Sequence, residues 1–233
     1  MRAMILAAGR GERMGQLTRD LPKPLIPIAG KALIVHQIER LRDAGFTDLV
    51  INISYRLEQI RAHLGSGKKL GVKIEYSTEP EGALDTGGGI ATATTLLGPD
   101  PFLVVNCDVW TNFDFSKLSS PPDQAHLVLV PNPTHNPDGD FCLSEGKIVI
   151  RNSPKLTFAG IGVYRPELFD GDHPARFPLA HLLRNAATRG TVSAELYLGK
   201  WIDIGTVERL NELKVLLRGE NKARNPVNLD PYD

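Results

Sequence analysis

The sequence has few cysteines and no net charge, and each shortage excludes a class of protein. Two cysteines occur in 233 residues, Cys107 and Cys142, and they form no C-x-x-C motif, which fits a reducing compartment. Cys107 lies in an apolar run and is expected to be a buried thiol. The 27 basic and 27 acidic side chains cancel, so no overall field attracts nucleic acid or an anionic membrane. A polyanionic ligand would therefore need local positive charge or a metal ion.

Long hydrophobic runs are also missing. No apolar stretch approaches the roughly 20 residues that a membrane-spanning helix needs. The chain begins directly with a predicted strand, which leaves no room for a signal peptide. We therefore expect a soluble, cytoplasmic protein. Because 42% of the residues are hydrophobic, the chain can form one large α/β domain with a buried core.

Short apolar runs alternate with helical periodicities through the first half of the chain. The predicted strands are 3–8, 49–54, 72–77 and 102–106. Three helices are predicted. The first has Ile34, Ile38 and Leu41 on one face and ends near Gly45, and the other two are 56–64 and 86–97. This alternation predicts right-handed crossovers and an open, mixed but mostly parallel Rossmann-like sheet. Helices are expected on both faces, giving three αβα layers.

The second half of the chain predicts a different pattern. Strands at 126–131, 147–151 and 158–164 are expected to have hairpin-type links, followed by a helix at about 178–189. A final helix is expected to begin at Thr206. We expect one domain over residues 1–220, with halves of about 1–110 and 111–220. Residues 221–233 show no periodicity and are interpreted as a disordered tail or a cloning remnant.

The stretch MILAAGRGERM (4–14) begins as a buried strand and ends in glycines and arginines. It is not a dinucleotide fingerprint, because Met14 replaces the third glycine and no acid follows about 20 residues later. It also lacks the Gly-Lys-Ser/Thr of a Walker loop. Small residues and successive N–H groups can enclose an anion, and Arg10, Arg13 and Lys23 add positive charge. A triphosphate explains the stretch best; a plain glycine turn with surface arginines is the alternative.

LAAGRGERM followed by LPKPLIPIAGKALI resembles the signature of the sugar-nucleotide pyrophosphorylases, or sugar-1-phosphate nucleotidylyltransferases. The similarity continues through DTGGGI, VVNCDVW and WIDIGT, over about residues 1–217. The resemblance implies the nucleotide-diphospho-sugar transferase fold and transfer of a nucleotidyl group from a nucleoside triphosphate to a sugar 1-phosphate. Mg²⁺ is the expected cofactor, and pyrophosphate is released. The first half of the domain would then bind nucleotide and the second half sugar.

Within this family we expect UTP and an N-acetylated sugar 1-phosphate as the substrates. The alternatives are another nucleotidyl transfer, such as guanylyl transfer to mannose 1-phosphate or thymidylyl transfer to glucose 1-phosphate, and a non-catalytic sugar-nucleotide sensor. No nucleic acid or membrane partner is expected. A monomer is the working expectation, and the residues alone leave the oligomeric state open.

The resemblance also implies roles for individual residues. Arg13 is expected to hold the triphosphate, and Lys23 to neutralise the α-phosphate and the transition state. Asp108 and Asp203 are expected to bind Mg²⁺, which prefers oxygen ligands and keeps positions for phosphates. The expected nucleotide-binding residues are Leu6, Ala7, Ala8, Gly9, Gly11, Glu79, Gly82 and Asn106. The expected sugar-binding residues are Gly139, Asp140, Gly160 and Glu195.

Two stretches depart from the family pattern. Asp85 stands in Leu-Asp-Thr where relatives commonly have Leu-Gly-Thr, and it is interpreted as a helix-capping acid. RNSPK (151–155) stands where many relatives have a Glu-Lys-Pro whose lysine contacts the acceptor phosphate. Lys155 is a candidate substitute, and Arg151 is a candidate partner for a carboxylate on the acceptor. A metal ion is expected to take over part of the neutralisation, which would make activity depend steeply on Mg²⁺.

Overall fold

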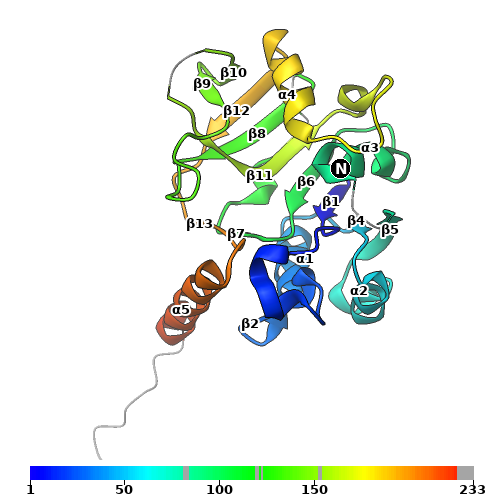
Figure 1. The fold of residues 1–233 in the computed structure, drawn as a ribbon, viewed down its shortest axis with the longest axis vertical. Helices are drawn as coiled ribbons and strands as arrows, with labels where there is room; N and C mark the ends of the chain where they lie inside the picture. Colours follow the sequence, from blue (N-terminus) through cyan, green and yellow to red (C-terminus); the bar gives the residue numbers. More distant parts are fainter. Residues whose placement is uncertain (81–83, 119–120, 122, 152–153, 225–233) are drawn as a thin grey trace, which may run out of the picture.

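A nine-stranded mixed sheet runs through the centre of the molecule (Figure 1). The computed structural model describes residues 1–80, 84–118, 121, 123–151 and 154–224, with side chains as far as residue 217. The strands of this sheet are β1 Ala3–Leu6, β4 Asp48–Ile53, β5 Lys73–Thr78, β6 Phe102–Asn106, β8 Ala125–Val130, β9 Cys142–Ser144, β10 Lys147–Val149, β11 Thr157–Tyr164 and β12 Val192–Leu196. Their spatial order is β5-β4-β1-β6-β11-β8-β12-β10-β9. Strands β5, β4, β1 and β6 are parallel, so their carboxyl ends meet at one edge of the sheet.

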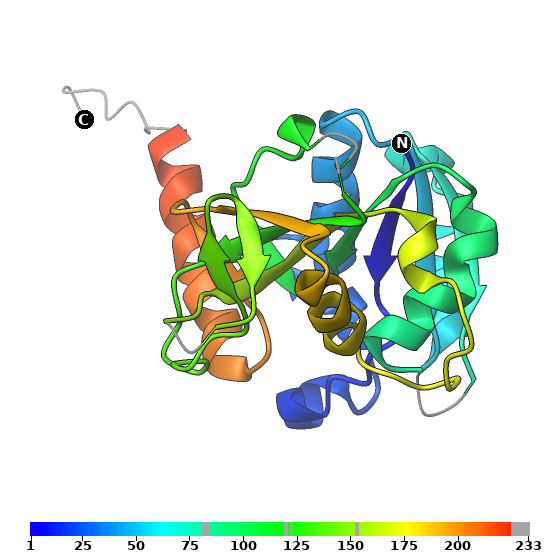
Figure 2. The same ribbon diagram turned by 90° about the horizontal axis from the view of Figure 1, so that it is seen from above.

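Helices cover both faces of the sheet, as the view from above shows (Figure 2). They are α1 Leu33–Asp43, α2 Leu57–Leu64, α3 Asp85–Leu97, α4 Leu179–Thr188 and α5 Val207–Arg224. Side chains alternate along each strand and so supply two cores. Ile5 of β1 packs in the core that includes residues of α1, α2 and α5, whereas Met4 packs in the core that includes α3 and α4. The predicted three-layer α/β fold is therefore confirmed.

The strand order of the second half differs from the prediction. Strand β12 lies between β8 and β10, and β8 pairs with β11 and β12, so the expected hairpin-type links are wrong. The hairpin that does form joins β10 to β9, a strand of three residues that was not predicted. Segments this short have too few residues to show an alternating pattern.

Two small strand pairs lie outside the main sheet. Strand β2 Pro27–Ile28 pairs with β3 Lys31–Ala32, and β7 Val109–Thr111 pairs antiparallel with β13 Trp201–Asp203. The short 3₁₀ turns are η1 Glu12–Thr18, η2 Lys23–Leu25, η3 Lys68–Leu70, η4 Phe115–Lys117 and η5 Pro166–Phe169. The β7–β13 pair joins the two halves of the chain next to Asp108.

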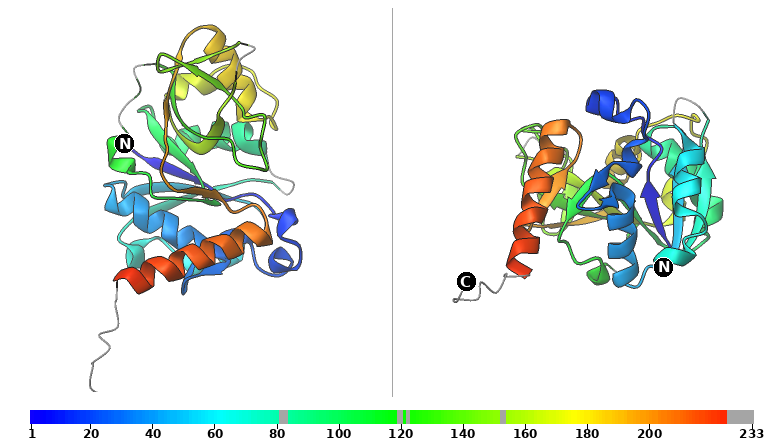
Figure 3. Two further views of the ribbon diagram at one scale, coloured as in Figure 1. Left: turned by 90° about the vertical axis from the view of Figure 1, so that its left-hand side faces the viewer. Right: turned by 90° about the horizontal axis from the view of Figure 1, so that it is seen from below.

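The last helix, α5, lies at the margin of the molecule (Figure 3). Leu210 and Leu213 are fully buried, so its first turns are fixed to the core. The helix continues to Arg224, beyond residue 220 where the tail was expected to begin, and residues 225–233 lie outside the described part. Among the described residues, no helix combines the length and the apolar character that crossing a membrane requires.

Candidate active site

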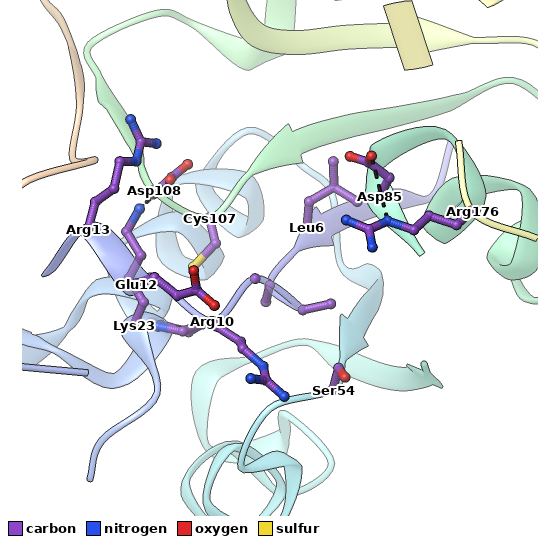
Figure 4. A pocket seen from close by; sticks show the side chains of 15 residues that line it. Leu6, Arg10, Glu12, Arg13, Lys23, Ser54, Asp85, Cys107, Asp108 and Arg176 are labelled. Carbon is purple, nitrogen blue, oxygen red and sulfur yellow. Dashed lines mark hydrogen bonds and ion pairs between the residues drawn. The ribbon is translucent and has the colours of Figure 1, made fainter. Parts of the chain in front are cut away.

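The glycine loop follows β1 and lines a cavity of about 650 Å³ (Figure 4). Its first residue is fixed by strand β4, because the Ala7 N–H donates to Asn52 Oδ1 over 2.7 Å. Gly11 has φ +69, and a Cβ there would lie 2.9 Å from Lys23 Cβ. Glycine is therefore needed at this position both for the backbone and for the approach of the lysine. The predicted residues that line this cavity are Leu6, Ala7, Ala8, Gly9, Gly11, Arg13, Lys23 and Asp108.

Lys23 is the buried cation of this cavity. It occupies the first position of a 3₁₀ turn between Pro22 and Pro24, and it is 8% exposed. Its Nζ forms an ion pair with Asp108, which follows β6. Cys107, beside Asp108, also lines the cavity, and burial is the main cause that raises the pKa of its thiol far above the usual range. The thiol is therefore a packing group and not a nucleophile, as expected.

The two predicted metal ligands lie close together. Asp203 pairs with Val109 across the β7–β13 ribbon, and the Ile204 N–H donates to the Asp108 carbonyl over 2.8 Å. Both aspartates line a second cavity of about 320 Å³, with side chains 29% and 21% exposed. Asp203 Oδ2 also accepts a 2.7 Å hydrogen bond from Arg209. Within the described ranges, no cluster of three or more His, Cys, Asp or Glu suits a metal ion.

This donor set fits Mg²⁺. Two carboxylates from separate segments face one cavity, and each has an oxygen besides the one that meets a cation. Mg²⁺ is typically held by one or two carboxylates and completes its shell with water and substrate phosphates. Asp108 and Asp203 would therefore be the residues that hold the ion, in the second cavity that both line.

The second cavity, called the sugar cavity below, is lined by two of the four predicted sugar-binding residues, Asp140 and Gly160. Asp140 lines it, and its Oδ2 accepts hydrogen bonds from the Phe158 N–H over 2.8 Å and from Asn136 Nδ2 over 3.2 Å. Gly160, at φ +71, lies where the β11–β8 register shifts, and a Cβ there would lie 2.6 Å from Asn106 Nδ2. A glycine is thus required for Asn106 to reach the cavity wall.

Other predicted residues lie elsewhere. Gly139 forms a turn at φ +62 against Lys155, and Glu195 is an exposed residue of β12 that faces His126 over 3.3 Å. Neither Gly139 nor Glu195 lines the sugar cavity, and the same holds for Lys155 and Arg151. The basic side chains that line it are Arg13 and His135. Gly82 lies outside the described residues.

Glu79 lies deeper than a surface base-contacting group would. It is 4% exposed, its Oε1 accepts from Asn52 Nδ2 over 2.6 Å, and its Oε2 accepts from the Leu84 N–H over 2.8 Å. It also lines a cavity of about 270 Å³ that adjoins the glycine loop. Through these hydrogen bonds, Glu79 connects the ends of β4 and β5 to the start of α3.

Several residues of the site were not predicted. Asn52 could have been found, because it is the polar residue in the otherwise apolar run LVINI. Arg176 and His135 lie in irregular segments without a periodic signal, and both line cavities. Asp85 is not the N-cap of α3: Leu84 occupies that position, and Asp85 is the first helical residue, at φ +63.

The family model described as nucleotidyl transferase matches residues 2–138 of the chain. An N-acetylmuramate alpha-1-phosphate uridylyltransferase of Neisseria meningitidis is 50% identical over 226 residues, covering 93% of this chain and 98% of the relative. The chain belongs to the nucleotidyl transferase family. A second relative of this nucleotidyltransferase, the N-acetylmuramate alpha-1-phosphate uridylyltransferase of Caulobacter vibrioides, is 33% identical over 220 residues, 87% of this chain and 91% of its own.

Solved structures support the fold of this nucleotidyltransferase independently. The inositol-1-phosphate CTP transferase from T. maritima superposes with a TM-score of 0.80 at 18% identity, covering 95% of this chain and 96% of that one. At this low identity, the structural similarity supports the fold alone. The expectation of a sugar-1-phosphate nucleotidyltransferase is confirmed by the family and by the two close relatives.

Proposed function

We propose that this enzyme transfers the uridylyl group of UTP to N-acetylmuramic acid 1-phosphate, giving UDP-N-acetylmuramic acid and pyrophosphate. The substrates are those in the name of the relative that is 50% identical over nearly its whole length. Because the product is a peptidoglycan precursor, the reaction belongs to cytoplasmic cell-wall recycling. The chain acts as one domain whose first half binds nucleotide and whose second half binds sugar.

One observation carries the proposal. Arg13 and Asp108 line both the glycine-loop cavity and the sugar cavity. A triphosphate in the first cavity and a sugar phosphate in the second therefore meet beside the same two side chains. A sensor that only bound sugar nucleotide would not need a buried lysine and two aspartates at this junction.

The reaction needs no protein nucleophile. The second pKa of a phosphate monoester is about 6, so the acceptor is mostly a dianion at pH 7. One of its oxygens bonds to the α-phosphorus of UTP, the bond from that phosphorus to the bridging oxygen breaks, and pyrophosphate leaves. Lys23 neutralises the α-phosphate and Arg13 orients the triphosphate. Asp108 and Asp203 would hold Mg²⁺, which would supply further charge neutralisation.

A pyrophosphate-release assay tests the proposal. UTP, GTP, CTP and dTTP are each combined with the 1-phosphates of N-acetylmuramic acid, N-acetylglucosamine, mannose and glucose. We expect the highest kcat/KM for UTP with N-acetylmuramic acid 1-phosphate. Lys23→Ala is expected to lose roughly 10²–10³-fold in kcat while remaining folded. A higher kcat/KM with any other pair, or no pyrophosphate from any pair, contradicts the proposal.

The metal requirement is a separate test. Lys155 lies outside the sugar cavity, so no lysine from the 151–155 segment replaces the acceptor-phosphate lysine of other family members. We expect activity to vanish with a chelator and to rise steeply with Mg²⁺, and Asp203→Asn to shift the half-maximal Mg²⁺ concentration upward. Activity that is flat across the Mg²⁺ titration would exclude this role.

A further inference from the structure

Two of the three glycines of DTGGGI pack against another part of the chain. A Cβ on Gly87 would lie closer than 3.0 Å to Phe177, and one on Gly88 would lie closer than 3.0 Å to the Ala175 carbonyl, whereas one on Gly89 would lie 2.5 Å from Glu79 Oε1. Positions 87 and 88 are therefore glycines because residues 175–177 pack directly on the backbone of the helix start. We refer to these three residues as the 175–177 segment.

Backbone hydrogen bonds fix the 175–177 segment to the start of α3. The Gly87 and Gly88 N–H groups donate to the Phe177 carbonyl over 3.0 and 3.1 Å, and the Phe177 N–H donates to the Leu84 carbonyl over 3.2 Å. Two of the N–H groups that a helix start would offer to an anion thus already have acceptors. The helix start serves as a docking platform for the second half of the chain.

Docking brings Arg176 to the mouth of the nucleotide cavity. Its guanidinium Nε lies 4.0 Å from Asp85 Oδ2, and both residues line the 650 Å³ and the 270 Å³ cavities. Figure 4 shows them on the opposite side of Leu6 from Arg13, Lys23 and Asp108. Arg176 therefore lies away from the cations that hold the triphosphate.

The surroundings of Arg176 suit a nucleoside. The smaller cavity contains Asn52, Glu79 and Thr86, which are polar groups able to contact a base and a ribose. The Arg176 side chain is 70% exposed and that of Asp85 is 44% exposed, and pairs this exposed contribute little free energy. Because Asp85 meets the Nε edge of the guanidinium, the planar face of Arg176 can contact a ligand while the pair persists. A guanidinium is planar and weakly hydrated, so it stacks well on an aromatic ring.

We propose that Arg176 is a nucleoside-binding residue: it closes over the base and ribose of the bound nucleotide, and Asp85 holds it in position beforehand. The inference rests on the proposed function in that the cavity takes a nucleoside triphosphate. It adds a contact from the second half of the chain to a nucleotide site otherwise built from the first half. The glycine run is what makes this contact possible.

Calorimetric binding of UTP to Arg176→Ala tests the contact without requiring turnover. We expect the Kd and the KM for UTP to rise roughly tenfold, the magnitude of a desolvated cation–π contact. The kcat and the KM for the sugar phosphate should stay near their wild-type values. Arg184→Ala is the matched control, because Arg184 is exposed on α4 and lines neither cavity.

Inorganic tripolyphosphate separates a nucleoside contact from a general effect of charge. Its inhibition constant should be equal for wild type and Arg176→Ala, because it has no base or ribose. The inference is overturned if UTP binding is unchanged in Arg176→Ala, or if tripolyphosphate inhibition weakens as much as UTP binding. Intact UTP binding without turnover in the wild type would instead contradict the proposed function alone.

Asp85→Asn tests the positioning role. Asparagine tolerates the left-handed backbone at this position, so the substitution removes the charge and little else. We expect the Kd for UTP to rise by roughly two- to fivefold, in keeping with an exposed ion pair. The KM for the sugar phosphate should not change. In the double variant Asp85→Asn/Arg176→Ala, the Kd for UTP should be no higher than in Arg176→Ala alone. A further rise of roughly two- to fivefold would show that Asp85 acts independently of Arg176.

Discussion

Replacing Glu79 with glutamine tests whether this buried carboxylate holds the nucleotide site together. The hydrogen bonds around it have fixed directions: the Ala7 N–H donates to Asn52 Oδ1, and Asn52 Nδ2 donates to Glu79 Oε1. The Leu84 N–H donates to Glu79 Oε2. A carboxylate accepts both bonds, whereas a glutamine amide has one oxygen and one NH₂ group. The glutamine NH₂ group would therefore face another donor, either Asn52 Nδ2 or the Leu84 N–H, and that hydrogen bond would be lost.

Turning over the Asn52 amide does not remove the conflict, because its NH₂ group would then face the Ala7 N–H. Every arrangement loses one hydrogen bond to a charged group, worth about 1.5–3 kcal/mol. Burying a neutral amide in place of a charge offsets part of the loss, which leaves about 2 kcal/mol of lost unfolding free energy. For a domain of this size, that corresponds to a fall in Tm of roughly 4–8 °C.

Thermal unfolding followed by circular dichroism measures the change. Glu75→Gln is the control on β5, the strand that Glu79 directly follows, since the Glu75 side chain is 35% exposed and its Oε1 accepts from Lys73 Nζ over 2.9 Å. We expect the control to leave the Tm unchanged. An unchanged Tm for Glu79→Gln together with a raised KM for UTP would refute the reasoning, because Glu79 would then only contact the base.

Three further outcomes are expected. Tyr164→Phe should raise the unfolding free energy by about 1 kcal/mol, since the buried hydroxyl has no hydrogen-bond partner among the described residues; a loss in urea unfolding would contradict this. Burial raises the pKa of Tyr164 and of Cys107, so the unfolded chain releases these protons at a lower pH than the folded chain does. The unfolding free energy should therefore fall as the pH rises above about 9, and an unfolding free energy that stays constant there would contradict this. Gly160→Ala should cost about 2 kcal/mol, because its Cβ would meet Asn106 at a backbone φ of +71; a wild-type Tm would exclude this.

The sequence predicts the first half of the fold well because three of its strands, β1, β4 and β6, are apolar runs buried on both faces, and the edge strand β5 follows the same order of elements. The strand predicted at 102–106 has those bounds in the structure, and 49–54 and 72–77 are displaced by one residue. Continuous apolar runs of this length bounded by turn residues have few alternative structures. The second half contains the three-residue strands β9 and β10, and its pairing depends on β12 entering between β8 and β10, which no local pattern encodes.

The candidate site divides in the same way. The loop residues and both aspartates could be predicted because they lie in motifs at the carboxyl ends of strands. Arg176 and His135 could not, since each reaches its cavity through the packing of an irregular segment. The glycine run was visible in the sequence, but the reason for Gly87 and Gly88 was not, because it depends on residues 175–177, far along the chain.

The ribbon of β7 and β13 fixes when the protein can first work during its own synthesis. Asp108 leaves the ribosome long before Asp203, and the stretch between them takes roughly 5–20 s to translate at about 5–20 residues/s. During that interval the nascent chain can fold its parallel strands while it carries one of the two carboxylates. An unfinished polypeptide, or one truncated before residue 201, would therefore have the strands of the first half but lack the second carboxylate of the proposed metal site.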